Sequence, residues 1–371
     1  MTSDRAERLE RARLTVDLAA LVANWRSLGR IASGAEVAAV VKADAYGLGL
    51  EPVARALARA GCRTFFVARL EEGEALRGIL PEARILVLDG LAGRPPARLV
   101  AARLVPVIGE PGELALWQRT ARAVEQRLAT ALLLDTGLTR LGLSAAEVAE
   151  LGPAAFAGLE LVLVASHLAC ADEPAHPLNE RQRAAFARMR ARLPPAPAGL
   201  AASSGLFLGP AFRLDQVRPG AALYGVNPTP GRPNPMRPVV RLEAPVLKVH
   251  EVREPGSVGY GATHPTRPGA RIAVVPVGYA DGWPRAASGR GRARIAGQEV
   301  PVVGRVSMDL LTLDVTAVPA DRVGPGTPVE LLGEAFGVDD LAAAASTIGY
   351  EVLTRLGRRF ERRWLAGEAA P

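Results

Sequence analysis

Lysine is nearly absent from this chain, so each lysine that does occur raises a chemical question. Of the 45 lysine and arginine residues only Lys42 and Lys248 are lysines, which leaves 43 arginines. Arginine stays protonated in proteins, whereas a lysine amine can lose its proton and form a Schiff base with an aldehyde. Lys248 lies in VLKVHEV, which is typical of a strand, and Lys42 ends the apolar run VAAVVKA. Lys42 is therefore the candidate for covalent chemistry.

Tyrosine is the second residue type used selectively. Each of the five tyrosines stands beside a glycine in a short segment: Tyr46, Tyr224, Tyr260, Tyr279 and Tyr350. A turn would account for any one of these pairs but not for all five. The pattern predicts that tyrosine serves here as more than core filler.

The remaining polar candidates follow apolar runs. Eight such runs alternate with helical stretches over the first 225 residues: 37–43, 64–68, 84–90, 104–109, 129–135, 159–167, 199–203 and 215–225. Eight strand-then-helix units predict a (β/α)8 TIM-type barrel, in which active-site residues lie at the C-terminal ends of the strands. Polar residues stand at five of these ends: Lys42, Asp135 with Arg140, His167, Ser203 with Ser204, and Arg218 with Gly220.

The pattern of apolar and polar residues changes after residue 230. The segment NPTPGRPNPMRP (227–238) has the composition of a linker, and the segments beyond it alternate or run apolar between glycines. One helix is expected from Asp339 onward. We therefore predict a barrel over residues 1–235 and a mostly β domain over residues 236–371.

Composition excludes several classes of protein. The 371 residues are 49% hydrophobic and 22% charged, which fits a globular chain and excludes disorder. Two isolated cysteines can form neither a disulfide framework nor a zinc site, so no metal is predicted. The net charge of +7 comes from basic residues scattered among acidic ones, which argues against nucleic acid. No signal peptide or membrane span is recognisable, so a cytoplasmic protein without a membrane partner is expected.

Eight segments in order along the chain resemble the motifs of alanine racemases. They are AVVKADAYGLG (39–49), LDTGLTRLGL (134–143), SHLACADEP (166–174), VRPGAALYG (217–225), VGYGATH (258–264), VGYADGWPR (277–285), VGRVSMD (303–309) and TIGYE (347–351). The resemblance spans nearly the whole chain. It implies a barrel that binds pyridoxal 5'-phosphate, a following β domain, a head-to-tail homodimer with shared active sites, and alanine as the substrate.

The resemblance also implies roles for individual residues. Lys42 is the lysine that holds the cofactor and then acts as acid and base on one face of the α-carbon. Tyr260 is the base on the other face, supplied by the partner subunit, because racemisation needs a proton-transferring group on each face. A phenol titrates near ~10 and needs a neighbour that lowers its pKa, a role that falls to His167.

The other implied site residues bind cofactor or substrate. Arg218 faces the pyridine nitrogen, and Arg140 lies near the phenolic oxygen. The phosphate group is bound by Tyr46, Ser204, Gly220, Ala221 and Tyr350, with Ser203 where asparagine is usual. The backbone at Met308 contacts the substrate carboxylate, Arg140 is a further substrate-binding residue, and Tyr279 with Tyr350 narrows the entrance. The most consequential departure is Leu133, because many members have there a carbamylated lysine that holds the arginine corresponding to Arg140.

Three functions therefore remain open. The leading one is an isomerase that supplies D-alanine for peptidoglycan. A racemase of broader range, for serine or basic amino acids, is disfavoured by the narrowing tyrosines and the missing signal peptide. A non-catalytic pyridoxal-phosphate carrier lacks a β domain, and the residues after 235 argue against it. A decarboxylase of related fold would be expected to use a cysteine after Cys170, and none is present.

Overall fold

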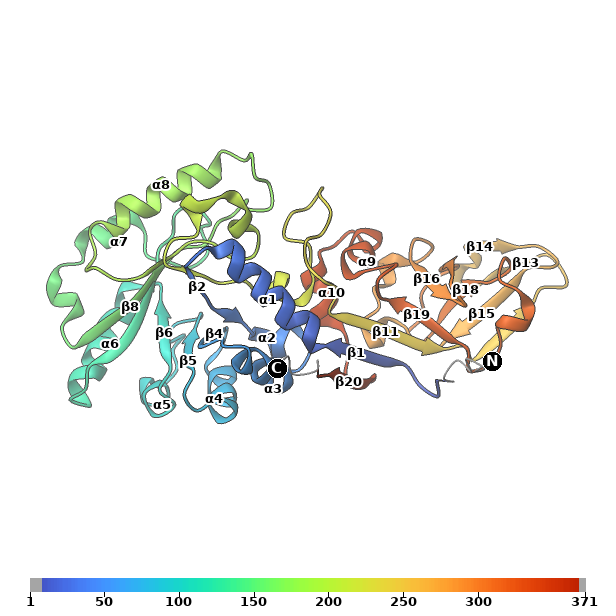
Figure 1. Cartoon of the computed structure of the whole chain (residues 1–371), viewed down its shortest axis with the longest axis horizontal. Coiled ribbons are helices and arrows are strands. Elements are labelled where there is room, and N and C mark those ends of the chain that lie inside the picture. The colour runs from blue at the N-terminus through green and yellow to red at the C-terminus, as the bar shows by residue number, and fades with distance from the viewer. Residues whose placement is uncertain (1–8, 367–371) are drawn as a thin grey trace. The chain divides into compact units, whose positions relative to one another are not determined.

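A computed structural model describes residues 9–366, and these residues form two compact units (Figure 1). The barrel unit contains residues 21–223 and 227–237. The β unit contains the described residues up to Ala20, Tyr224–Val226, and the chain from Pro238 onward. The first eight residues of the charged N-terminal segment lie outside the described part. Within residues 9–366, no helix combines the length and the apolar character that crossing a membrane requires.

The barrel unit is built on parallel strands that are apolar and buried. Seven strands pair in chain order: β3 (Ala39–Val40), β4 (Thr64–Val67), β5 (Arg84–Val87), β6 (Val105–Ile108), β7 (Leu128–Leu133), β8 (Leu159–Ala165) and β9 (Ala198–Gly199). β-branched and aromatic residues such as Phe65, Phe66 and Ile85 fill them and are fully buried.

An eighth strand closes the barrel. β10 (Gln216–Val217) pairs in parallel with β2 (Glu36–Val37), which directly precedes β3. On its other side the Asp215 N–H donates to the Ala198 carbonyl and the Arg218 N–H to the Ala201 carbonyl, at 3.0 and 2.9 Å. The predicted fold class, a parallel α/β barrel followed by a mostly β domain, is confirmed.

Helices connect the strands and lie along them (Figure 1). They are α1 (Leu18–Ala32), α2 (Lys42–Tyr46), α3 (Leu50–Arg59), α4 (Leu70–Ile79), α5 (Pro96–Ala101), α6 (Pro111–Ala123), α7 (Ala145–Glu150) and α8 (Leu178–Arg190). Short 3-10 turns are η1 (Pro153–Phe156), η2 (Ser204–Leu208), η3 (Pro210–Phe212) and η4 (Ala221–Tyr224). Local signals begin several helices: α6 has proline at its first position, and Ser144 caps α7 in a capping box with Glu147.

Three predicted segments differ from the structure. The first strand is shorter than 37–43 because Ala38 separates β2 from β3 and the chain turns at Lys42. The eighth is only Gln216–Val217, since residues 221–224 form η4. The predicted linker is held to the barrel unit: the Arg237 N–H donates to Asn24 Oδ1 (2.8 Å), and Asn24 Nδ2 donates to the Arg237 carbonyl (2.9 Å).

The β unit contains three sheets. Its six-stranded sheet has the order β17 (Gln298–Pro301), β16 (Arg292–Ile295), β19 (Pro328–Leu332), β11 (Val240–Pro245), β1 (Arg13–Asp17), β20 (Glu361–Leu365). The second sheet has the order β12 (Lys248–Glu251), β15 (Arg271–Val275), β18 (Leu311–Asp314), and the third is the hairpin β13 (Gly256–Val258) with β14 (His264–Thr266). The 3-10 turns are η5 (Tyr260–Ala262), η6 (Tyr279–Asp281), η7 (Arg285–Ala287) and η8 (Ala320–Arg322).

The single helix expected after Asp339 is two helices in the structure. α9 (Val338–Ala345) ends at Ser346, whose φ of 56° lies in the left-handed region. α10 (Gly349–Arg355) begins three residues later, and its first residue packs so closely against Val226 that an added Cβ would come within 3.1 Å. The break places Tyr350 in the first turn of a new helix.

Candidate active site

Lys42 begins an unusual turn at the C-terminal end of β3. Ala43, Asp44, Ala45 and Tyr46 all have φ between 54° and 56°, which is the left-handed helical region. Each L-residue there costs about 1–2 kcal/mol relative to a right-handed helix, so the surrounding structure must hold the turn. Gly47 and Gly49, which also have positive φ, complete it, and the Gly49 N–H donates to the Asp44 carbonyl at 2.9 Å.

The amine of Lys42 is easier to deprotonate than an ordinary lysine. Burial lowers its pKa, and the positive charge of Arg140 lowers it further, while the carboxylates of Asp89 and Glu72 act in the opposite direction. A lowered pKa increases the fraction of neutral lysine amine, which is the form that can act as a nucleophile and as a base.

Arg218 is the most buried charge of the barrel unit's site. Only 6% of its surface is exposed, and burial lowers its pKa to about 10. Its Nη2 donates to the Ser166 carbonyl at 2.6 Å, whereas Nη1 is buried without a partner among the described residues. Gly199 provides the room, because a Cβ there would lie 2.5 Å from Nη1. The guanidinium thus keeps one donor for a group that enters the site.

His167 lies beside these cations and is neutral at physiological pH. Burial lowers its pKa to about 4, and the charges of Arg218, Arg140 and Lys42 add to the effect. The backbone around it is fixed by Gln182, which is fully buried: Nε2 donates to the His167 carbonyl (2.9 Å), and the Ala169 N–H donates to Oε1 (2.9 Å). Three cations around a neutral imidazole form a cluster suited to an anion.

A second group of site residues surrounds Gly220. A Cβ on Gly220 would lie 2.3 Å from Tyr46 Oη, so only glycine lets the phenol approach the backbone this closely. The buried Ser203 hydroxyl accepts the N–H groups of Gly220 (3.1 Å) and Ala222 (3.2 Å). Ser204 follows at the start of η2, and Ala221 at the start of η4. The structure therefore brings these five predicted residues, Tyr46, Ser203, Ser204, Gly220 and Ala221, to the ends of β3, β9 and β10.

Arg140 is placed by the backbone of its loop. Asp135 Oδ1 accepts the N–H groups of Gly137, Leu138 and Thr139 at 2.9–3.1 Å. The loop then returns to β7, where the Leu143 N–H donates to the Leu133 carbonyl at 2.8 Å. Within residues 9–366 the guanidinium of Arg140 has no hydrogen-bonded or ion-paired side chain. Asp135 therefore holds the loop and makes no ion pair with Arg140.

Four predicted site residues belong to the β unit. Tyr260 lies in η5 between Gly259 and Gly261, both with positive φ, and is 72% exposed. Tyr279 and Met308 lie on neighbouring loops, because the Tyr279 N–H donates to the Ser307 carbonyl (3.1 Å) and the Ala280 N–H to the Met308 carbonyl (2.9 Å). Met308, Tyr279 and Tyr350 are also exposed.

Two acidic residues near Lys42 were not predicted from the sequence. Asp89 follows β5 and Glu72 lies in the first turn of α4, and both carboxylates act on the Lys42 amine. The sequence signal was available, since both come shortly after an apolar strand and hence at the same end of the barrel as Lys42.

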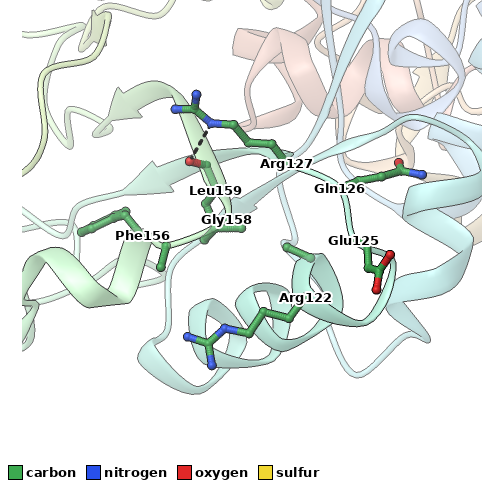
Figure 2. Close-up of a pocket in the computed structure, with 9 residues that line it drawn as sticks. Arg122, Glu125, Gln126, Arg127, Phe156, Gly158 and Leu159 are labelled. Carbon is green, nitrogen blue, oxygen red and sulfur yellow. Dashed lines mark hydrogen bonds between the residues drawn. The ribbon is translucent and has the colours of Figure 1, made fainter.

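The structure also has a hollow at the opposite ends of the strands. This space has a volume of about 500 Å³ and lies beside the first residues of β7 and β8. Figure 2 shows residues that line it, among them Arg122, Glu125, Arg127 and Phe156. Arg127 Nε donates to the Leu159 carbonyl there at 3.3 Å. Catalytic groups of barrels lie at the C-terminal ends of the strands, so this hollow is separate from the Lys42 site. No group of three or more His, Cys, Asp or Glu residues suited to a metal occurs in the described part of the chain.

Comparison with known proteins gives consistent matches over both units. Residues 16–228 match the family described as alanine racemase, N-terminal domain, and residues 239–364 match alanine racemase, C-terminal domain. Alanine racemase of Methylobacterium nodulans is 50% identical over 363 residues, which cover 96% of this chain and 97% of that protein. The biosynthetic alanine racemase of Agrobacterium fabrum is 44% identical over 372 residues, covering 96% and 94%. The crystal structure of alanine racemase from Bartonella henselae with covalently bound pyridoxal phosphate has a TM-score of 0.92 at 37% identity, covering 96% of this chain and 100% of that one.

Proposed function

The chain belongs to the alanine racemase family, and we propose that Lys42 and Tyr260 are the two groups that move the α-proton of alanine. It is a pyridoxal-phosphate-dependent isomerase that interconverts L-alanine and D-alanine. The observation that carries the assignment of Lys42 is the cluster of charged side chains at the ends of the barrel strands. There Lys42 has a lowered pKa, His167 is neutral, and the buried Arg218 has one N–H donor without a partner among the described residues. The charges of Lys42 and Arg218 both act on His167.

The residues present fit the cofactor. Arg218 Nη1 is a buried donor without a partner among residues 9–366, and it can donate to a ring nitrogen that carries no proton. The positive charges around His167 suit a phosphate ester and a phenolate. When bound, the cofactor stabilises negative charge that develops at the α-carbon of the amino acid. The residues proposed to hold it are Lys42, Tyr46, Arg140, His167, Ser203, Ser204, Arg218, Gly220, Ala221 and Tyr350.

Arg218 also supports racemisation over competing chemistry. Its guanidinium is a permanent cation, and a cation beside the ring nitrogen disfavours protonation of that nitrogen. With the cofactor bound, Arg218 would in this way favour return of the proton to the α-carbon over its addition elsewhere. Arg218 is therefore proposed to direct the proton as well as to bind.

Lys42 is proposed to accept the α-proton at Nζ, and to return it, on one face of the α-carbon. Its lowered pKa increases the fraction of neutral amine, which is the form that can accept a proton. Tyr260 is proposed to do the same through its hydroxyl on the opposite face. Its phenol is 72% exposed, which supports a role toward a partner subunit in a head-to-tail homodimer.

Substrate size is proposed to be set by residues of the β unit. The Met308 N–H has no acceptor among the described residues and is proposed to bind the substrate carboxylate together with Arg140. Tyr279 and Tyr350 are proposed to narrow the entrance and to favour the methyl side chain of alanine. A cytoplasmic location, a supply of D-alanine to peptidoglycan and a domain boundary at residues 235 and 236 are likewise proposals.

The two lysines allow a direct test of the assignment. Borohydride should fix the cofactor on Lys42, and Lys42→Arg should remove visible absorbance and racemisation together, because arginine cannot react with the aldehyde. Lys248→Arg is the matched control, since Lys248 is exposed on β12, and it should change neither. Mass mapping of the reduced cofactor to Lys248 would overturn the assignment.

A further inference from the structure

Glu72 holds the left-handed turn that carries Lys42. Its Oε1 accepts the Ala43 N–H at 2.7 Å, which is the N–H of the peptide bond that directly follows Lys42. Its Oε2 accepts the N–H groups of Ala68 (2.8 Å) and Arg69 (3.2 Å) at the start of α4. One carboxylate therefore ties the turn after β3 to the turn after β4.

These two turns follow adjacent strands of the barrel. β3 pairs with β4 at Ala39–Phe65 and Val40–Phe66, and the Val41 N–H donates to the Phe66 carbonyl at 2.9 Å. Strand pairing stops there, and beyond it the backbone of Ala43–Tyr46 adopts a conformation that L-residues disfavour. A charge-assisted hydrogen bond to the first N–H of that turn is the interaction placed to stabilise it.

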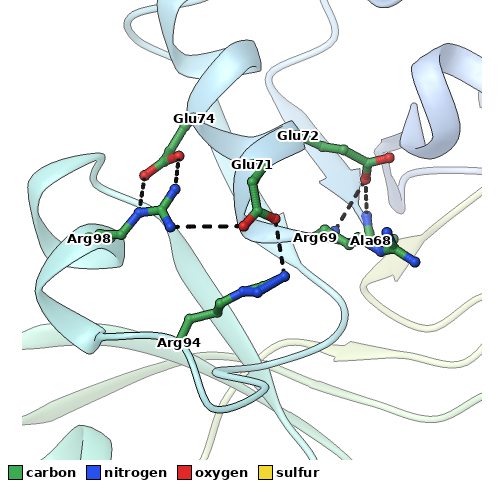
Figure 3. Close-up of polar contacts among 7 residues, drawn as sticks. All are labelled: Ala68, Arg69, Glu71, Glu72, Glu74, Arg94 and Arg98. Carbon is green, nitrogen blue, oxygen red and sulfur yellow. Dashed lines mark hydrogen bonds and ion pairs between the residues drawn. The ribbon is translucent and has the colours of Figure 1, made fainter.

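The neighbouring acidic residues of α4, Glu71 and Glu74, pair with arginine side chains and not with the backbone. Figure 3 shows Glu72 turned toward the backbone of Ala68 and Arg69, whereas Glu71 and Glu74 face the arginines of the adjacent segment. Glu71 pairs with Arg94 (3.3 Å) and Arg98 (3.8 Å), and Glu74 accepts from Arg98 Nε (2.9 Å). Glu71 is half exposed, and such surface pairs contribute little. Glu71 is thus a matched control for Glu72 on the same helix turn.

We propose that Glu72 is a positioning residue for racemisation, whose carboxylate fixes the peptide after Lys42 and so aims the Lys42 amine. This inference rests on the proposed role of Lys42. The alternative is that Glu72 only caps the N-terminus of α4 through Oε2, as the third residue of a capping box. The bond from Ala43 to Oε1 lies outside the capping box and belongs to the Lys42 turn.

Glu72 also acts on Lys42 through its charge. Its carboxylate and that of Asp89 raise the pKa of Lys42, against the lowering by burial and Arg140, and His167 is the remaining titratable group that interacts with Lys42. Loss of the Glu72 charge should therefore make Lys42 easier to deprotonate. Loss of the hydrogen bond from the Ala43 N–H, with the Glu72 charge kept, should misplace the Lys42 amine without changing its pKa in this way. Two variants separate the effects.

The experiment compares Glu72→Gln, Glu72→Asp and Glu71→Gln in the full-length holoenzyme. Hydrogen exchange followed by mass spectrometry should show roughly 10- to 100-fold faster exchange in fragments covering residues 40–49 for both Glu72 variants. Aspartate keeps the charge but is one methylene shorter, so it cannot reach Ala43 and Ala68 together. Both variants should lower kcat by at least about 10-fold, with a smaller change in KM. Glu71→Gln should match the wild type in both measurements.

The pH profile of kcat distinguishes the effect of the Glu72 charge on Lys42 from a general loss of protein stability. The acidic limb of kcat should move down by about 0.5–1 pH unit in Glu72→Gln and stay in place in Glu72→Asp. Faster exchange confined to residues 70–79, with 40–49 unchanged, would show that Glu72 only caps α4 and would overturn the proposal. Failure of the Lys42 assignment is distinguishable, because it would show as cofactor fixed on Lys248 whatever the exchange rates.

Discussion

At the scale of single residues, the state of His167 can be tested through protein stability. Its folded-state pKa is about 4, against 6.5 for a free imidazole, because burial and three cations oppose its protonation. Between these pH values the unfolded chain binds more protons than the folded one. The free energy of unfolding must therefore rise as pH increases from 4 to 6.5, by at most about 3 kcal/mol from this group, and must be lost again as pH falls.

The measurement is urea unfolding of the wild type and of His167→Gln at several pH values from 4 to 8. The glutamine variant should lose this part of the pH dependence, so that the difference between the two proteins shrinks in acid. His250→Gln, on the exposed strand β12, is the control. A difference between wild type and His167→Gln that is constant with pH would contradict the burial of a neutral imidazole.

Leu133 supports a second prediction at this scale. A lysine carbamate beside Arg140 would hold the guanidinium by charge-assisted hydrogen bonds, and leucine has neither charge nor acceptor. Only Lys42 and Lys248 exist elsewhere in the chain, so no other lysine can replace it. Activity should therefore be indifferent to bicarbonate, and the intact mass should show no carbamate.

The converse variant completes the Leu133 test. Leu133→Lys should acquire a dependence on bicarbonate and a modest change in cofactor affinity, which activity assays in degassed and bicarbonate-containing buffer would measure. If instead the unmutated protein gains activity with bicarbonate, the role given to Leu133 is wrong.

At the scale of elements, the approach of β10's loop to the Lys42 turn depends on one missing side chain. An added Cβ at Gly220 would lie 2.3 Å from Tyr46 Oη, and Tyr46 is itself buried in the left-handed turn. Gly220→Ala should cost about 1–3 kcal/mol of stability and weaken cofactor binding, because either the phenol or the turn must move. Gly78→Ala in α4, where the space is open, should be neutral or stabilising by up to about 1 kcal/mol. Equal cofactor affinity in both variants would contradict this packing argument.

The elements predicted from the sequence were those that burial dictates. The last three residues of TFFV and of RILV are apolar and buried, as parallel strands covered on both faces must be, and these runs form β4 and β5. The ends of elements were less predictable. Ser346 takes a left-handed conformation that its residue type does not announce, and it divides the helix expected after Asp339.

In the candidate site, too, some residues could be predicted from the sequence and others could not. The strand-end rule gave Lys42, Arg140, His167 and Arg218 as candidates, and in the structure the three cations act on the neutral His167. Glu72 was missed because a glutamate in the first turn of a helix is ordinary capping chemistry, and only the fold shows its second oxygen on Ala43. The left-handed conformation of residues 43–46 was not predictable, since none of these four residues, Ala, Asp, Ala and Tyr, is a glycine.

At the scale of the whole molecule, the proposed homodimer raises the question of which subunit supplies Tyr260. Tyr260, Met308 and Ile348 are 72%, 54% and 61% exposed, which is unusual for large apolar or aromatic side chains of one unit. Exposed groups of this kind are typical of interaction surfaces. A symmetric dimer would cover the same surface on both copies and would give each barrel a tyrosine from its partner.

Complementation between two inactive variants tests that arrangement. Tyr260→Phe should abolish racemisation while sparing cofactor absorbance, because one of the two proton-transferring groups is removed. Lys42→Arg should abolish both. In a mixed population, half of the dimers are hybrids, and each hybrid has one site with an intact lysine from one subunit and an intact tyrosine from the other. Co-expression with different tags, followed by purification through both, should therefore yield activity, at about a quarter of the wild-type level before hybrid selection. Hybrids that are confirmed by both tags yet fully inactive would place Tyr260 in the site of its own chain, because only then does every site in a hybrid lack one of the two groups.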